Sequence, residues 1–170
     1  MAPSAPSAPT PAVHVTPSLD EGTAKHTGPQ IAEMIEDVGG TLSMGATGGS
    51  VHVLAPHRHL GLELLLECLA QPNFPKEAFN RQRSQQLSAI DDAERQPQTR
   101  ARRVFRETVY GKHPYGSPNG GRRATVEKLT PADCAAFHRR LFVPNNTLLA
   151  VVGDFDSRQV AEEVQRLTAG

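Results

Sequence analysis

Leu141-Phe-Val-Pro-Asn-Asn-Thr-Leu-Leu-Ala-Val-Val-Gly-Asp154 is the segment that best indicates the fold class of this chain. Pro144 ends the helix before it, and Asn146 to Val152 is an apolar, β-branched run of strand length. An earlier stretch, Tyr110-Gly-Lys-His-Pro-Tyr-Gly116, predicts an irregular loop because glycine and proline interrupt regular structure. A helix that leads into an apolar strand, with such a loop before it, indicates a mixed α+β chain.

A β-hairpin is predicted nearer the N-terminus. Residues 41–47 and 50–55 flank Gly48-Gly49, a dipeptide that tolerates positive φ in a tight turn. Because side chains alternate along a strand, Val51 and Val53 should share one face of this hairpin.

Helices are predicted over most of the remaining chain, because apolar residues recur there at helical spacing. Prolines at first turns and glycines or prolines at the ends mark their limits. Thr130 is expected to cap one helix, and Asp156 or Ser157 another. These helices cover residues 29–38, 57–69, 75–94, 97–109, 131–143 and 157–167. The predicted fold class is α+β, with a few-stranded, mainly antiparallel sheet covered by several helices.

Charge and composition exclude several classes of partner. The 18 lysines and arginines balance 18 aspartates and glutamates, so no basic excess indicates binding to nucleic acid or to a membrane surface. No apolar run approaches the roughly 18 residues of a membrane helix, and no secretory signal pattern opens the chain. A cytoplasmic location is expected as written, or a periplasmic one if a signal was lost.

Cys68 and Cys134 lie in apolar helical patterns that favour buried thiols, with a disulfide as the alternative.

The order of these elements and motifs resembles the N-terminal half-domain of the insulinase, pitrilysin and mitochondrial processing peptidase family. The resemblance implies a LuxS/processing-peptidase-like metallopeptidase half-domain over residues 19–170, truncated at its N-terminal side. Residues 1–18 are a Pro/Ala/Ser-rich tail whose composition predicts disorder. The matching motifs are Asp20-Glu-Gly-Thr23, Gln30-Ile-Ala-Glu33 with Gly39-Gly40, Pro72-Asn-Phe-Pro75, Val109 to Gly116, Leu129-Thr-Pro-Ala-Asp133, and Phe137 to Asn146 followed by Thr147 to Gly153.

Active members of this family carry an inverted zinc motif, H-x-x-E-H, on an early helix, and a distant glutamate completes the ligands. The resemblance puts these positions on Val13, Thr16, Pro17 and Ala89. None of the four side chains binds zinc or serves as a good general base, and Pro17 would break the helix. If the motif is shifted by one residue so that His14 takes the first histidine position, Pro17 and Ser18 fall on the glutamate and second histidine positions, and neither can replace them. We therefore expect neither catalytic residues nor zinc in this chain, although active family members bind zinc.

The resemblance implies a non-catalytic role, as a partner or chamber-wall subunit for a zinc-bearing peptidase half. In the family, an extended substrate peptide pairs with the strand that corresponds here to Thr41, Leu42, Ser43, Met44 and Gly45. Pairing through backbone hydrogen bonds needs no particular side chain, so this strand is a candidate peptide-binding site. An ordinary edge strand is the structural alternative.

The sequence is also compatible with two other functional interpretations. The chain could be a truncated gene product without independent function. It could also be an active zinc metalloendopeptidase with non-standard ligands drawn from His14, His52, His57 and His59.

The remaining polar groups have structural interpretations. His113 indicates a hydrogen-bonding loop residue, because no nucleophile or acid partner accompanies it. The carboxylates of Asp91, Asp92 and Glu94 indicate a charged helix surface, not an acid–base pair. Solvated or interface surfaces are likewise predicted for the basic groups Arg100, Arg102, Arg103, Arg106, Arg122, Arg123, Arg139 and Arg140.

Overall fold

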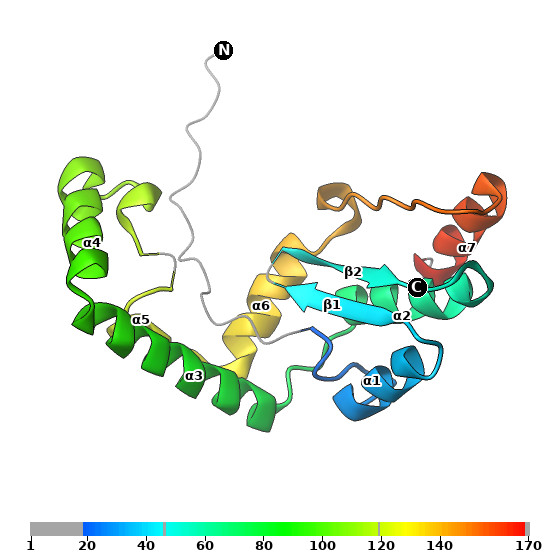
Figure 1. The fold of residues 1–170 in the computed structure, drawn as a ribbon, viewed down its shortest axis with the longest axis horizontal. Coiled ribbons are helices and arrows are strands. Elements are labelled where there is room, and N and C mark those ends of the chain that lie inside the picture. The colour runs from blue at the N-terminus through cyan, green and yellow to red at the C-terminus, as the bar shows by residue number, and fades with distance from the viewer. Residues whose placement is uncertain (1–18, 46, 119, 169–170) are drawn as a thin grey trace, which may run out of the picture. The chain divides into compact units, whose positions relative to one another are not determined.

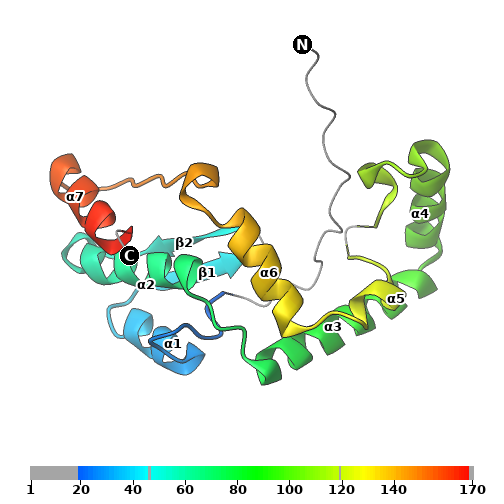
Figure 2. The ribbon, with the colours of Figure 1, turned by 180° about the vertical axis from the view of Figure 1, so that it is seen from behind.

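A computed structural model describes residues 19–45, 47–118 and 120–168. The chain divides into two compact units, which are considered separately. One unit contains residues 16–79 and 131–170, and the other includes residues 80–130. Figures 1 and 2 show the path of the chain through both.

The described part of the chain is mainly helical, as the sequence predicts. Its one sheet is an antiparallel pair of strands. The elements are α1 (Gly28–Glu36), β1 (Thr41–Gly45), β2 (Gly48–His52), η1 (Ala55–His57), α2 (Arg58–Ala70), α3 (Lys76–Arg95), α4 (Pro97–Tyr110), η2 (Pro114–Gly116), α5 (Arg123–Val126), α6 (Pro131–Leu141), η3 (Pro144–Asn146) and α7 (Ser157–Thr168). The fold class is therefore confirmed as α+β.

The β-hairpin is present, but its turn is shifted from the predicted position. Gly45 pairs with Gly48, so the turn lies between these two residues, and Gly48-Gly49 begins the second strand. Glycine at position 49 has a packing reason, because a Cβ there would overlap the Met44 side chain of the paired strand. Gly48 has φ of 150°, a backbone conformation that side chains disfavour. Gly49 thus serves strand packing, whereas Gly48 serves the backbone conformation at the start of β2.

Helix α2 packs on one face of the hairpin. Val51 and Val53 share one face of the hairpin, as predicted, and this face points toward α2. Gly61 of α2 allows the close approach, because a Cβ at Gly61 would lie 2.9 Å from Val53 Cγ2. Apolar residues lie all round α2, which also contacts β1, α1 and α7. Leu62, Leu64, Leu65 and Cys68 of this helix are buried.

An aromatic cluster joins α6 to the end of α2. His138 lies edge-on to Phe74, with ring centroids 5.8 Å apart, and stacks on Phe142 at 4.8 Å. Its Nε2 lies 2.8 Å from the backbone oxygen of Leu69, so the Nε2–H of a neutral His138 donates a hydrogen bond to this carbonyl. Burial lowers the pKa of His138.

The unit that contains residues 80–130 is held by polar contacts. Arg83 donates to the Leu129 carbonyl at 3.1 Å, and Gln86 donates to the Gly120 carbonyl at 2.8 Å. Helix α4 contacts η2, where the rings of Tyr110 and Tyr115 meet edge to face at 5.8 Å.

The predicted strand over residues 146–152 is wrong. Residues 144–146 form η3, and the chain then continues as an extended segment outside the described sheet. Leu148 is 93% exposed and Val152 97% exposed. A strand is defined by its pairing, and no described strand lies in hydrogen-bonding contact with this segment.

Candidate functional site

The positions predicted to correspond to the family's zinc site lie only partly within the described chain. Val13, Thr16 and Pro17 lie outside the described residues, as does His14. Ala89 lies in α3 and is exposed. Within residues 19–45, 47–118 and 120–168, no three His, Cys, Asp or Glu side chains are grouped so that they could hold a metal ion.

The structure does not bring the other candidate histidines together as a metal site. His52 lies on the face of β2 that points away from α2, and His57 is exposed in η1. His59 contacts Glu163 of α7 through Nδ1, and its Nε2 lies 3.9 Å from Glu63. His59 thus lies between the carboxylates of Glu63 and Glu163. This arrangement is consistent with an ion pair that links α2 to α7.

The outer edge of β1 is the first candidate for peptide binding. The carbonyl of Ser43 points toward β2, since it would lie 2.9 Å from a Cβ on Gly49. Because hydrogen-bonding directions alternate along a strand, Leu42 and Met44 direct their backbone groups outward. No described strand pairs with that edge.

A small cavity of about 240 Å³ lies beside the start of β1. Its lining combines residues of α1, among them Ile31 and Ile35, with Gly40, Thr41 and Leu42 at the start of the strand. A peptide paired with β1 would therefore have an apolar recess next to it. The predicted strand Thr41 to Gly45 exists, and its free edge and this recess are compatible with peptide binding.

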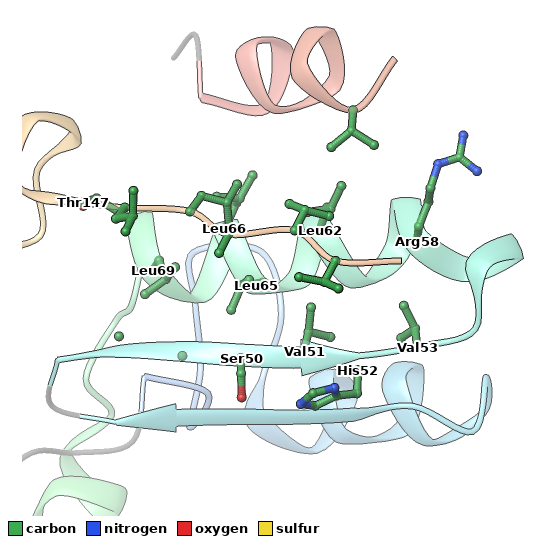
Figure 3. Close-up of a pocket in the computed structure, with 18 of the residues that line it drawn as sticks. Ser50, Val51, His52, Val53, Arg58, Leu62, Leu65, Leu66, Leu69 and Thr147 are labelled. Atoms are coloured by element: carbon green, nitrogen blue, oxygen red, sulfur yellow. The ribbon is translucent and has the colours of Figure 1, made fainter. Parts of the chain in front are cut away.

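A larger cavity, with a volume of about 980 Å³, is a groove on the other side of the hairpin. We call it the α2 groove. One wall is β2, the other is the extended segment of residues 147–153, and the floor is formed by Leu62, Leu65, Leu66 and Leu69 of α2. Figure 3 shows the extended segment beside β2, with these leucines between them. The groove was not predicted from the sequence, because residues 146–152 were expected to form a strand.

Several of the charged groups singled out from the sequence form surface ion pairs. Asp91 contacts Arg123, and this guanidinium lowers the pKa of the Asp91 carboxyl. Glu94 lies 3.0 Å from Arg103. The carboxylates are therefore paired with arginines, which agrees with a charged surface and not with an acid–base pair. Two further ion pairs join Asp92 to Arg95 and Glu107 to Arg122. Arg106 donates a hydrogen bond to the Tyr115 carbonyl, and His113 Nδ1 accepts one from the Tyr115 backbone N–H.

No family model matches this chain. It is nevertheless 25% identical over 151 residues to an uncharacterized zinc protease of Mycobacterium leprae, a match that covers 86% of this chain and 34% of that protein. It is 24% identical over 151 residues to a probable mitochondrial-processing peptidase subunit beta of Arabidopsis thaliana, covering 86% of this chain and 28% of the relative. The chain thus spans about a third of the length of these curated relatives.

Two solved structures illustrate the similarity in fold. A peptidase M16 inactive domain from Pseudomonas fluorescens matches with a TM-score of 0.68 and 27% identity, over 75% of this chain and 33% of that one. A protease from Helicobacter pylori matches in fold with a TM-score of 0.75 at 20% identity, over 88% of this chain and 38% of that one. In the described residues, no helix is both long and apolar enough to span a membrane.

Proposed function

We propose that this chain, identified by sequence and fold as a half-domain of the insulinase, pitrilysin and mitochondrial processing peptidase family, is a non-catalytic partner of a zinc-bearing half. One observation carries the proposal. By the resemblance, the family's zinc-site positions would correspond to Val13, Thr16, Pro17 and Ala89, and none of these side chains is a zinc ligand. The chemistry of peptide hydrolysis would then be supplied by zinc in another polypeptide.

The contribution of this chain would be to hold peptide. The free edge of β1 offers backbone donors and acceptors at Leu42 and Met44, and the recess lined by Ile31 and Ile35 lies beside it. Pairing with a strand edge gives affinity through the main chain and leaves specificity to such recesses. The fold neighbour described as an inactive domain supports a role without catalysis.

Zinc content and activity test the non-catalytic part of this proposal. We expect the purified chain to hold less than about 0.1 zinc per molecule by mass spectrometry and to leave an unfolded peptide, the oxidised insulin B chain, intact. About one tightly bound zinc per chain, with hydrolysis that a chelator stops, would refute it and would favour non-standard ligands.

Peptide binding tests the role of β1. Leu42→Pro removes an outward N–H while sparing the bonds to β2, and it should weaken binding of the labelled B chain at least about tenfold. Val51→Pro is the matched control, because its N–H points away from β1 on the opposite strand. Equal effects of the two prolines would contradict the assignment to β1.

The partner role needs a separate measurement. Each zinc-bearing family member encoded in the same genome is assayed for peptide hydrolysis with and without this chain. At least one should gain activity in its presence. If none gains activity and none binds, the reading as a truncated product without independent function replaces the proposal.

A further inference from the structure

We propose that a surface formed by the second half of α4 and by η2 binds single-stranded nucleic acid, with bases stacked on tyrosine rings and phosphates paired with cationic side chains. We call this surface the aromatic–basic patch, and its residues are Arg102, Arg106, Tyr110, Lys112, His113 and Tyr115. It lies within the unit that contains residues 80–130, whereas the proposed peptide site on β1 belongs to the other unit. The inference therefore does not depend on the proposed peptidase role.

The balanced charge of the whole chain conceals an unequal division between the two units. Residues 80–130 carry 11 lysines and arginines against 5 aspartates and glutamates, a net charge of +6, so the rest of the chain carries −6. A local basic excess attracts the phosphates of nucleic acid even where the total charge is zero. The sequence as a whole gave no such indication, because the two halves cancel.

The carboxylates of residues 80–130 do not neutralise the aromatic–basic patch, because arginines outside it engage all five of them. The ion pairs are Asp91–Arg123, Asp92–Arg95, Glu94–Arg103, Glu107–Arg122 and Glu127–Arg123. Arg102 and Lys112 are exposed and form no ion pair with the described residues. Arg106 donates to the Tyr115 carbonyl at 3.0 Å, a neutral acceptor that leaves its charge without a counter-ion. Three cations of the patch thus remain for an anionic ligand.

Exposed aromatic rings lie beside these cations. The ring of Tyr115 meets that of Tyr110 edge to face at 5.8 Å and that of His113 at 4.8 Å. Tyr110 is 43% exposed and Tyr115 65% exposed. Exposed rings next to basic side chains are the surfaces on which proteins stack unpaired bases.

The fold gathers the rings and the cations on one face. Arg102, Arg106 and Tyr110 are spaced by four residues along α4, so they lie one above the other on the same side of the helix. The contact between Arg106 and the Tyr115 carbonyl holds η2 beside them. Figure 1 shows the loop after α4 returning along the end of this helix.

A single strand satisfies both parts of the patch. Its bases present open aromatic faces, and its phosphates lie along the same chain. A duplex keeps its bases stacked on one another, and an acidic peptide supplies charge without a ring to stack. Stacking of this kind tolerates every base, and it needs no contact with the sugar. Strands of DNA and RNA therefore share the chemistry that the patch recognises.

The direct test uses the protein's own fluorescence. Tyr110 and Tyr115 are the only tyrosines and the chain has no tryptophan, so the emission of the full chain reports on the patch. A strand of twelve thymidylates and one of twelve uridylates, titrated at about 50 mM salt, should both quench it. Free N-acetyltyrosinamide, titrated in parallel, corrects for light absorbed by the bases. An unchanged emission with both strands would overturn the inference.

An abasic strand with the same phosphates separates stacking from charge. In anisotropy measurements it should bind at least about fivefold more weakly than the thymidylate strand, because it lacks the bases that stack. Equal binding of the two strands would overturn the inference. Tighter binding to phosphatidylglycerol vesicles than to the thymidylate strand would also overturn it, since the ligand would then be a membrane surface.

Two arginine variants locate the binding on α4. Arg102→Gln should weaken the thymidylate strand at least about fivefold, and it should reduce the slope of log affinity against log salt by about 0.7, the loss of one phosphate contact. Arg100→Gln removes the same charge from the same helix, but it lies on the opposite side and should change the affinity less than about twofold. Equal effects of the two variants would mean that net charge alone binds the strand, which would overturn the patch.

Ring variants test the stacking. Tyr115→Leu should weaken the thymidylate strand at least about fivefold, whereas Tyr115→Phe keeps the ring and should bind like the wild type. Both variants retain the backbone carbonyl that Arg106 contacts, and Tyr115 is exposed, so neither should unfold the chain. An unchanged affinity of Tyr115→Leu would contradict the inference. Leu42→Pro, which tests the β1 site, should leave strand binding unchanged, so the two proposals fail separately.

Discussion

The imidazole of His26 lies 2.9 Å from the carboxylate of Glu67, measured from Nδ1 to Oε1. Glu67 is 6% exposed on α2, and the hydroxyl of Thr23 donates to the same carboxylate oxygen. A buried carboxylate is tolerated when its oxygens accept hydrogen bonds in this way. The contact ties the Asp20-Glu-Gly-Thr23 motif to the helix that packs on the hairpin.

Glu67→Ala should lower the free energy of unfolding by about 1–3 kcal/mol, because it removes the acceptor of the His26 ring and leaves the buried Thr23 hydroxyl only the longer contact with the His26 carbonyl, at 3.2 Å. Urea denaturation measures the change. Glu63→Ala is the matched control on the same helix, since that carboxylate is half-exposed and lies 3.9 Å from His59, and its effect should stay below about 0.5 kcal/mol. Similar losses in both variants would show that the buried contact is not the cause.

Acid should destabilise the chain through His138. Burial lowers its pKa in the folded state below the ordinary value of about 6.5, so the unfolded state binds a proton first as the pH falls. The contribution of neutral, buried His138 to the free energy of unfolding is fully present above about pH 6.5 and is lost progressively as the pH falls below that value. Urea curves at two pH values, one on each side, should show a larger loss in the wild type than in His138→Gln. A loss of the same size in both proteins would remove His138 as the cause.

The two cysteines should remain unreactive in the folded chain. Burial raises the pKa of Cys68 to about 12 and that of Cys134 to about 11, so neither thiol forms the reactive thiolate at neutral pH. Both are free, which agrees with buried thiols and not with a disulfide. Titration with a thiol reagent at pH 7.5 should detect neither in the native protein and both in urea. Rapid reaction of either thiol without denaturant would contradict their burial.

Gly61 should tolerate alanine far better than valine. A Cβ at this position approaches Val53 Cγ2 at 2.9 Å, a side-chain tip that can shift, and alanine gains up to about 1 kcal/mol of helix propensity. Gly61→Val adds two methyl groups in the same contact and should lower stability by about 1–3 kcal/mol. Thermal unfolding of the two variants gives the comparison. A valine variant as stable as the alanine variant would mean that β2 does not pack closely on α2.

Local signals in the sequence predicted most elements. Pro131 and Thr130 marked the start of α6, and Asp156 caps α7 by accepting from the backbone N–H of Arg158 and Gln159. Such signals succeed because the hydrogen bonds of a helix join residues four apart. The hairpin was also predicted, but Gly48-Gly49 was assigned to the turn because the contact with Met44 across the strands could not be known from the sequence.

The sequence by itself determined the helices, the hairpin and the residue types at the family's zinc positions, since these depend on local periodicity and on side-chain identity. The tertiary structure alone decided that residues 147–153 lie beside β2 without a described strand between them, and that Thr23 and His26 meet Glu67. The reason is physical. Strand pairing and buried hydrogen bonds join residues far apart in the chain, so an apolar run of strand length shows only a capacity to pair, and the fold decides whether a neighbour is present.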